Sequence, residues 1–295
     1  LAIWACRTVS AISPITVKGS KLYDENGKQF YLKGVQYLRW ANDEEPEDLG
    51  DPLLDGEQCE IDAELLKELG ANTIRVYGLT TDDDHDDCMK AFADAGIYVW
   101  LDLYPLGGRI EPITPEWTKV MFDEWTRTMD NFAKYDNLLL FTIGDSVIYT
   151  SGPSHVNVAP LIKAATQDMK AHRKARGFRP IPLIYISTDL EEVRTMSAEF
   201  LACGNGDETI DAYAITVRNW CDGTDFFDRG YDKLAQEFEN FHLPVIFLTG
   251  CENNNSRSAY PDVKGILGKT FEDIFSGVVV FEWAVEVRDL SLVEY

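Results

Sequence analysis

Eight short apolar segments, separated by longer amphipathic stretches, set the main constraint on the fold of this chain. They span residues 34–37, 73–76, 98–103, 138–143, 183–187, 212–217, 245–248 and 278–283. Segments this apolar are typical of parallel strands that are buried on both faces of a sheet. Helical patterns lie between them at residues 62–69, 84–95, 115–134, 158–174 and 231–240.

This alternation predicts an α/β protein. Eight strand–helix units in about 260 residues are typical of a (β/α)8, or TIM, barrel. The alternative is an open doubly wound sheet, but no glycine-rich phosphate loop follows any of the predicted strands. We therefore expect the barrel.

Two local signals add detail to this fold. The dipeptide Asn26-Gly27 lies between two short apolar runs within residues 21–32, which favours an N-terminal β-hairpin. Gly70 and Gly96 each follow a predicted helix and precede a predicted strand, which is the usual place for a left-handed C-cap.

The chain contains no internal repeat, low-complexity tract or flexible linker. We expect one barrel domain over residues 1–295, in which residues 1–14 form an N-terminal extension. The small residues Val9-Ser10-Ala11 resemble the cleavage site of a signal peptide, and the alternative is an ordered segment held by Cys6. We expect the protein in the secretory pathway or the extracellular space.

The charge of the chain narrows its possible partners. It carries 27 basic and 50 acidic side chains, a formal net charge of −23. Such a surface repels phosphate backbones and anionic lipids, so we expect no nucleic-acid partner. No apolar stretch reaches the roughly 18 residues that a membrane helix needs, so we expect no transmembrane segment.

The cysteines predict disulfides rather than a metal site. They are Cys6, Cys59, Cys88, Cys203, Cys221 and Cys251. No two of them have the C-x-x-C spacing of a zinc site, and no nicotinamide or flavin motif is present, so we expect no metal and no cofactor. The even number favours three disulfides in an oxidising compartment, and the alternative is six buried thiols in a cytosolic protein.

In a TIM barrel, ligands bind where the strands end and the following loops begin. The residues at these places form a candidate pocket that mixes aromatic and charged side chains, as small-molecule sites usually do. They are Leu38, Trp40, Tyr77, Asp102, Tyr104, Asp145, Ser146, Arg218, Trp220, Thr249, Phe281, Glu282 and Trp283. The histidines form no catalytic group, and His85 is interpreted as a helix-start residue.

Several segments, in the same order along the chain, carry the residues of a known family. They read GVQY at 34–37, LGANTIRVY at 69–77, HDDCM at 85–89, DAGIYV at 94–99, WC at 220–221 and FSG at 275–277. They resemble glycoside hydrolase family 72, the fungal β-1,3-glucanosyltransferases of the cell wall. The resemblance implies a (β/α)8 barrel and the disulfides Cys59–Cys88 and Cys221–Cys251.

The resemblance also implies two catalytic glutamates, an acid/base and a nucleophile about 5 Å apart across the glycosidic bond. The family's acid/base lies in a Gly-Asn-Glu stretch after the fourth strand, where this chain has Gly144-Asp145-Ser146. Its nucleophile lies in a Ser-Glu-Tyr-Gly-Cys stretch after the seventh strand, where residues 247–251 read FLTGC. A serine hydroxyl is too weak an acid for the first role, and neither leucine nor threonine can stabilise the positive charge in the second. Both catalytic carboxylates are therefore predicted to be missing.

Further departures from the family lie around the same predicted mouth. Leu38 stands in place of a sugar-binding glutamine, Gly78 in place of an asparagine, and Phe281, Trp283 and Arg218 in place of tyrosines. A buried sugar hydroxyl left without a partner costs about 1–3 kcal/mol. These changes predict a ligand that is less polar than glucan.

Three functions follow from these observations. The favoured one is a repurposed barrel that has lost glycosyl transfer and binds a less polar small molecule. Any turnover would be a cyclisation, isomerisation or elimination that uses Asp102, Asp145, Glu282 and Arg218 for acid–base or electrostatic catalysis. The second is a non-catalytic pseudoenzyme that binds β-glucan or a protein partner. The third is an active β-1,3-glucanosyltransferase, with an oligosaccharide as its ligand.

Overall fold

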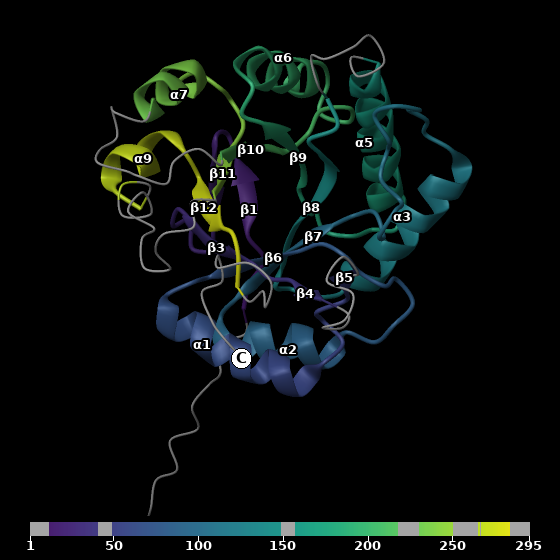
Figure 1. The fold of residues 1–295 in the computed structure, drawn as a ribbon, viewed down its shortest axis with the longest axis vertical. Helices are drawn as coiled ribbons and strands as arrows, with labels where there is room; N and C mark the ends of the chain where they lie inside the picture. Colours follow the sequence, from purple (N-terminus) through teal and green to yellow (C-terminus); the bar gives the residue numbers. More distant parts are fainter. Residues whose placement is uncertain are drawn as a thin grey trace, which may run out of the picture.

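The computed structural model describes residues 12–40, 49–148, 157–217, 230–249, 265 and 267–283. These residues form a barrel of parallel strands surrounded by helices, as Figure 1 shows. No helix among them is both long enough and apolar enough to cross a membrane.

The closed barrel confirms the predicted fold class. Its strands are β3 (Leu32–Gln36), β6 (Thr73–Val76), β7 (Tyr98–Asp102), β8 (Leu138–Asp145), β9 (Leu183–Thr188), β10 (Ala212–Val217), β11 (Val245–Thr249) and β12 (Gly277–Val280). Barrel strands that follow one another along the chain pair with each other, and β12 pairs with β3 to close the barrel. The last strand ends at Val280 and not at Trp283 as predicted.

Helices cover the outside of the barrel. They are α1 (Gly56–Leu69), α2 (Asp86–Ala95), α3 (Lys119–Phe132), α5 (Val158–Ala175), α6 (Glu191–Ala202), α7 (Tyr231–Phe238) and α9 (Lys269–Ile274). The helix α1 begins six residues earlier than predicted because Asp55 caps it and accepts a hydrogen bond from the Gln58 backbone. The helix α6 was not predicted. Its apolar residues do not keep to one face, since Met196 and Phe200 are exposed.

Both predicted glycine caps are confirmed. Gly70 and Gly96 adopt φ values of 84° and 81° at the ends of α1 and α2. Their backbone N–H groups bond back to the last turn of each helix, which satisfies carbonyl groups that a helix end leaves open.

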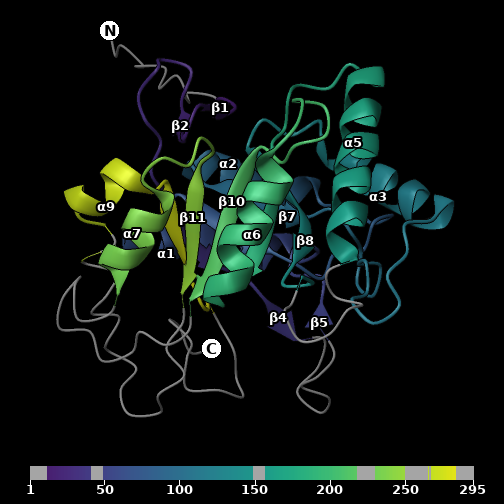
Figure 2. The same cartoon turned by 90° about the horizontal axis from the view of Figure 1, so that it is seen from above.

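The predicted N-terminal hairpin is present but uses a different turn. Strands β1 (Thr16–Lys18) and β2 (Lys21–Tyr23) pair antiparallel, whereas only one bridge, between Tyr23 and Gln29, spans the Asn26-Gly27 turn. The second strand that was predicted after this turn, up to residue 32, is not formed as part of the hairpin, because Leu32 is fully buried and begins β3. Leu22 from β2 belongs to the same buried cluster as Leu32, so the hairpin covers the amino end of the barrel (Figure 2).

The loops after the strands lie at the opposite end, which we call the mouth. Two short strands there, β4 (Arg39–Trp40) and β5 (Leu49–Gly50), form an antiparallel pair between β3 and α1, the β4–β5 hairpin. Figure 2 shows this hairpin at the end of the barrel that faces away from β1 and β2.

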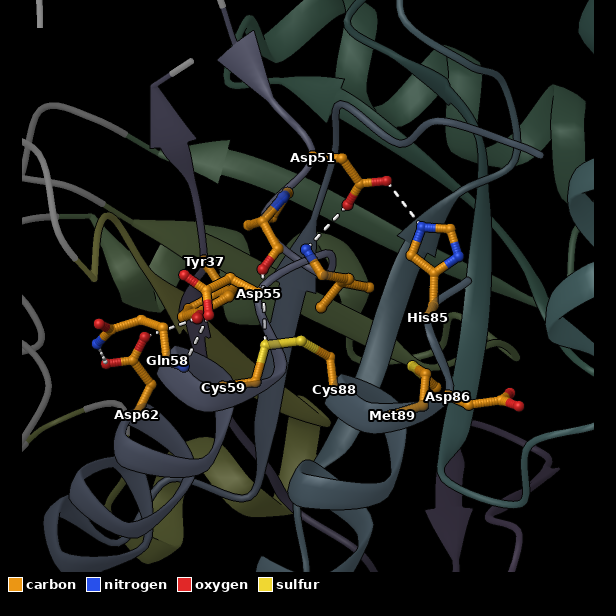
Figure 3. Close-up of a disulfide and its surroundings, with 12 residues drawn as sticks. Tyr37, Asp51, Asp55, Gln58, Cys59, Asp62, His85, Asp86, Cys88 and Met89 are labelled. Carbon is orange, nitrogen blue, oxygen red and sulfur yellow. Dashed lines mark hydrogen bonds and ion pairs between the residues drawn. A yellow bond between two sulfur atoms is a disulfide. The ribbon is translucent and has the colours of Figure 1, made fainter. Parts of the chain in front are cut away.

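One of the disulfides implied by the family resemblance is confirmed. Cys59 in α1 and Cys88 in α2 are joined, which ties the first two helices together (Figure 3). Cys203 is a free, exposed thiol at the end of α6, so the prediction that it forms a disulfide is wrong. Cys6, Cys221 and Cys251 lie outside the described residues.

Candidate active site

The inside of the barrel changes from apolar to polar toward the carboxyl ends of its strands. Its middle is a buried cluster that includes Trp100, Leu140, Ile184, Ile186, Ala212, Ala214, Ile246 and Val279. Side chains alternate between the two faces of a strand, so the next inward positions can be read from the sequence. They are Gln36, Arg75, Asp102, Thr142, Thr188 and Thr216. We call these six residues the polar layer.

Arg75 is the centre of the charged part of this layer. Its side chain is only 3% exposed, and its Nη2 atom lies 2.8 Å from Oδ2 of Asp145 and 3.4 Å from Oδ1 of Asp102. Burial alone would lower the pKa of Arg75, but the two carboxylates outweigh that effect and raise it above its usual value. The Arg75 guanidinium also lies 5.2 Å from the ring centre of Tyr77 and 5.5 Å from that of Trp100. This buried cation therefore joins three strands.

The two carboxylates that flank Arg75 differ in environment. Asp102 is buried, and burial raises its pKa above the usual value although Arg75 lowers it. Thr142 and Tyr104 also form hydrogen bonds with Asp102. The side chain of Asp145 is 29% exposed, so it is the carboxylate of this pair that a ligand in the mouth can reach.

Asp145 faces inward because β8 contains an irregularity. Phe141 and Ile143 pack toward the helices, and the pairing of β8 with β9 shifts between Thr142 and Gly144. A Cβ atom on Gly144 would lie 2.9 Å from Ile162 in α5, so this position also faces the helices. Because Ile143 and Gly144 both face the helices, the in–out alternation of β8 reverses, and the next side chain, that of Asp145, faces into the barrel.

Ser146 follows with a φ of 53°, the one positive value among the described non-glycine residues. Its backbone N–H donates to the carbonyl oxygen of Ile186, 2.8 Å away, which holds the turn after β8 against β9. A non-glycine residue in this region of backbone space costs about 1–3 kcal/mol and is often found at functional sites.

The structure brings only part of the predicted pocket together. Tyr77 and Tyr104 lie beside Arg75 and the two aspartates, and burial raises the pKa of Tyr77 to about 12. Glu282, which is buried beyond the end of β12, contributes to that raised pKa because its charge lies near Tyr77.

The remaining predicted residues lie around this centre or outside the described part. Thr249 ends β11 and is largely buried, and Phe281 is half-buried. Leu38 and Trp283 are buried. Trp40 lies in β4, and Arg218 and Trp220 belong to the residues that the structure does not describe.

Arg75 is the main functional residue that the sequence analysis missed. A signal was present, because Arg75 interrupts the otherwise apolar strand Thr73–Val76 and its neighbours Ile74 and Val76 face the helices. No group of acidic, histidine and cysteine side chains suited to a metal ion occurs among the described residues.

Comparison with known proteins identifies the family to which this barrel belongs. The sequence profile described as "Glucanosyltransferase", of glycoside hydrolase family 72, matches residues 5–295. The chain is a member of family 72.

Named relatives of this family 72 chain share about a third of its residues. It is 36% identical over 287 residues to the 1,3-beta-glucanosyltransferase gas1 of Schizosaccharomyces pombe, with 96% of this chain and 52% of the relative covered. It is 35% identical over 285 residues to the 1,3-beta-glucanosyltransferase gel1 of Aspergillus fumigatus, with 96% and 61% covered. The chain thus spans about half to three-fifths of the length of these relatives.

Solved structures agree with this assignment. Saccharomyces cerevisiae Gas2p in complex with laminaritriose and laminaritetraose superimposes with a TM-score of 0.87 at 29% identity, over 97% of this chain and 64% of that one. A Gas2 structure in complex with a ligand called compound 11 gives a TM-score of 0.88, with 97% and 65% covered.

These comparisons contradict the favoured function from the sequence. Relatives are named glucanosyltransferases, and a similar structure holds laminari-oligosaccharides, so the inference of a less polar small-molecule ligand is wrong. Its physical basis was incomplete. It counted apolar replacements such as Leu38 and Phe281 but did not include the buried cation Arg75, which holds Asp102 and Asp145 together.

Proposed function

We propose that this family 72 chain binds β-1,3-glucan oligosaccharides at the mouth of its barrel and transfers glucanosyl units between them. The similarity to named glucanosyltransferases supports the substrate class. The observation that carries the chemical proposal is the inward position of Asp145, 2.8 Å from Arg75 at the end of β8.

Glucanosyl transfer breaks one glycosidic bond and forms another, so one group must give a proton and later take one back. The leaving sugar oxygen receives a proton, and the hydroxyl of the acceptor sugar loses one. We assign both transfers to Asp145. It is the more exposed carboxylate beside Arg75, and it lies one residue from the family's acid/base position.

The neighbours of Asp145 fix its position in the site. Arg75 fixes the carboxylate through Nη2 and is itself held by Asp102. Glu282 lies near Tyr77, and its carboxyl group is assigned to stabilise the positive charge that develops on the sugar ring. Thr188 and Thr216 in the polar layer offer hydroxyl groups that match the hydroxyls of glucose.

A second function is favoured by one specific observation. Ser146 occupies the place of the acid/base glutamate that the family resemblance implies, and the run at 247–251 that matches the nucleophile stretch holds no carboxylate. A site of this kind would bind β-1,3-glucan without cleaving it. This candidate shares its ligand with the first and differs only in turnover.

The proposed location is the secretory pathway or the extracellular space. The disulfide between Cys59 and Cys88 supports it, because disulfides persist mainly in oxidising compartments.

Laminaripentaose separates the two functions. Calorimetric titration measures binding, and chromatography of the incubated mixture measures products. Binding together with products both longer and shorter than the pentaose is the expected result. Binding without any new product would select the second function, and the absence of both would contradict the proposal.

A further inference from the structure

The segment after the β4–β5 hairpin carries a buried carboxylate with four hydrogen-bond donors. Asp51 follows β5 directly, and its side chain has no exposed surface. Its Oδ1 atom accepts from the Leu53 backbone at 2.9 Å. Its Oδ2 atom accepts from the Thr80 backbone at 2.8 Å, from the Thr80 hydroxyl at 2.9 Å, and pairs with Nε2 of His85 at 2.8 Å.

Three of these four donors come from the next loop of the mouth, and the fourth, the Leu53 backbone, belongs to the segment of Asp51 itself. Thr80 lies between β6 and α2, and His85 immediately precedes α2, where its ring is 4.8 Å from that of Phe132 in α3. His85 is buried and forms no capping bond to the helix through its side chain. Its position at the helix start was predicted correctly, but its bond to Asp51 joins the first two loops of the mouth (Figure 3).

The same region is held by two further links. The Cys59–Cys88 disulfide joins α1 to α2 three residues after His85, and Sγ of Cys59 lies 3.6 Å from the Pro52 carbonyl oxygen. On the other side of the hairpin, the hydroxyl of Tyr37 donates to Asp62 in α1 at 2.6 Å. Both ends of the β4–β5 hairpin are therefore fixed to the helices beneath it.

We propose that Asp51, through Thr80 and His85, positions the β4–β5 hairpin as one wall of the glucan site. Three donors from the neighbouring loop and one from its own segment converge on Asp51 where the hairpin returns to the barrel. Asp51 and His85 act through the hairpin and are positioning residues. The inference rests on the proposed function, because it assigns the hairpin to that site.

Two substitutions at His85 test this proposal. His85→Phe keeps an aromatic ring beside Phe132 but removes the bond to Asp51, whereas His85→Gln keeps a nitrogen donor in nearly the same place. Asp51→Asn is a second test, because its amide would place an NH2 group against a backbone N–H of Leu53 or Thr80.

A similar pair at the other end of the barrel provides the control. Nε2 of His172, in the last turn of α5, lies 2.8 Å from Asp130 in α3. Helices run back toward the amino ends of the strands, so this pair lies away from the mouth. His172→Phe removes the same kind of contact without touching the hairpin.

Two readouts are compared: hydrogen exchange of the β4 and β5 backbone amides, and the dissociation constant for laminaripentaose. We expect His85→Phe and Asp51→Asn to speed exchange at these amides about tenfold and to weaken binding about tenfold. His85→Gln should keep the exchange rate and the dissociation constant within about threefold of the wild type. His172→Phe should do the same, although the melting temperature of this variant falls.

The outcomes distinguish this proposal from the proposed function. If His85→Phe lowers the melting temperature but leaves hairpin exchange and affinity at wild-type values, the pair is merely structural and the proposal is overturned. Faster exchange with unchanged affinity overturns the assignment of the hairpin to the glucan site. If the wild type does not bind laminaripentaose, the proposed function fails, and the exchange data alone decide whether Asp51 anchors the hairpin.

Discussion

The guanidinium of Arg75 reaches the carboxylate of Asp145 across the mouth of the barrel, at 2.8 Å. The contact joins β6 to β8 over the intervening strand β7, whose Asp102 binds the same nitrogen. A buried cation with two carboxylates is costly to take out of water, and each charge depends on the others.

Arg75→Met tests this dependence. We expect a loss of about 3–5 kcal/mol in the free energy of unfolding, because two carboxylates would remain without their buried partner. Urea denaturation measures the effect. In the Arg75→Met background, adding Asp102→Asn should recover part of the loss. A destabilisation below about 1 kcal/mol would show that the three charges are not coupled.

The raised pKa of Asp102 predicts a pH dependence of stability. Burial places its pKa in the folded protein above the ordinary value of 3.8, so the folded state binds more protons than the unfolded state between these two values. Stability therefore falls as the pH rises through this interval. Asp102→Asn lacks this effect, so its stability relative to the wild type should increase with pH from 3.8 upward and then level off. Urea denaturation of both proteins between about pH 3.5 and 7 measures the difference. A difference that is constant or decreases with pH would contradict the assignment.

Sequence patterns gave the strands of this barrel because each is a short apolar run between helical segments. They placed Asp145 among the pocket candidates but could not predict the bulge in β8 that turns it inward, because the bulge depends on how Gly144 meets Ile162 across the strand–helix interface. They also missed the pair of Asp51 and His85, which are 34 residues apart and carry no local signal. Arg75, by contrast, was readable from the alternation within its strand.

The disulfide between Cys59 and Cys88 should contribute measurable stability. It closes a loop of 29 residues, for which the chain-entropy model predicts about 3–4 kcal/mol. Replacing both cysteines by serine should lower the free energy of unfolding by this amount in guanidinium chloride. Cys203→Ser, at the exposed free thiol, is the control and should change stability by less than about 0.5 kcal/mol. Equal effects of the two changes would contradict the prediction.

Gly277 at the start of β12 closes the barrel and allows no side chain. Its φ is 146°, and a Cβ atom there would lie 2.3 Å from the carbonyl oxygen of Leu32 in β3. We expect Gly277→Ala to cost more than about 3 kcal/mol, because backbone atoms must move. Gly206→Ala, where a Cβ meets nothing within 4 Å, should be close to neutral. Thermal melting compares the two, and a similar midpoint for both variants would show that the closure tolerates a side chain.

The central claim is that Asp145 moves the proton during transfer on β-1,3-glucan. Its most direct test is the initial rate of transfer on laminaripentaose in Asp145→Asn and in a matched control, Asp211→Asn. Asp211 also pairs with a buried cation, Lys170, at 2.6 Å, but lies at the amino end of β10. We expect Asp145→Asn to slow transfer by about 100-fold or more while laminaripentaose still binds, and Asp211→Asn to transfer at close to the wild-type rate. Transfer at the wild-type rate in Asp145→Asn would contradict it.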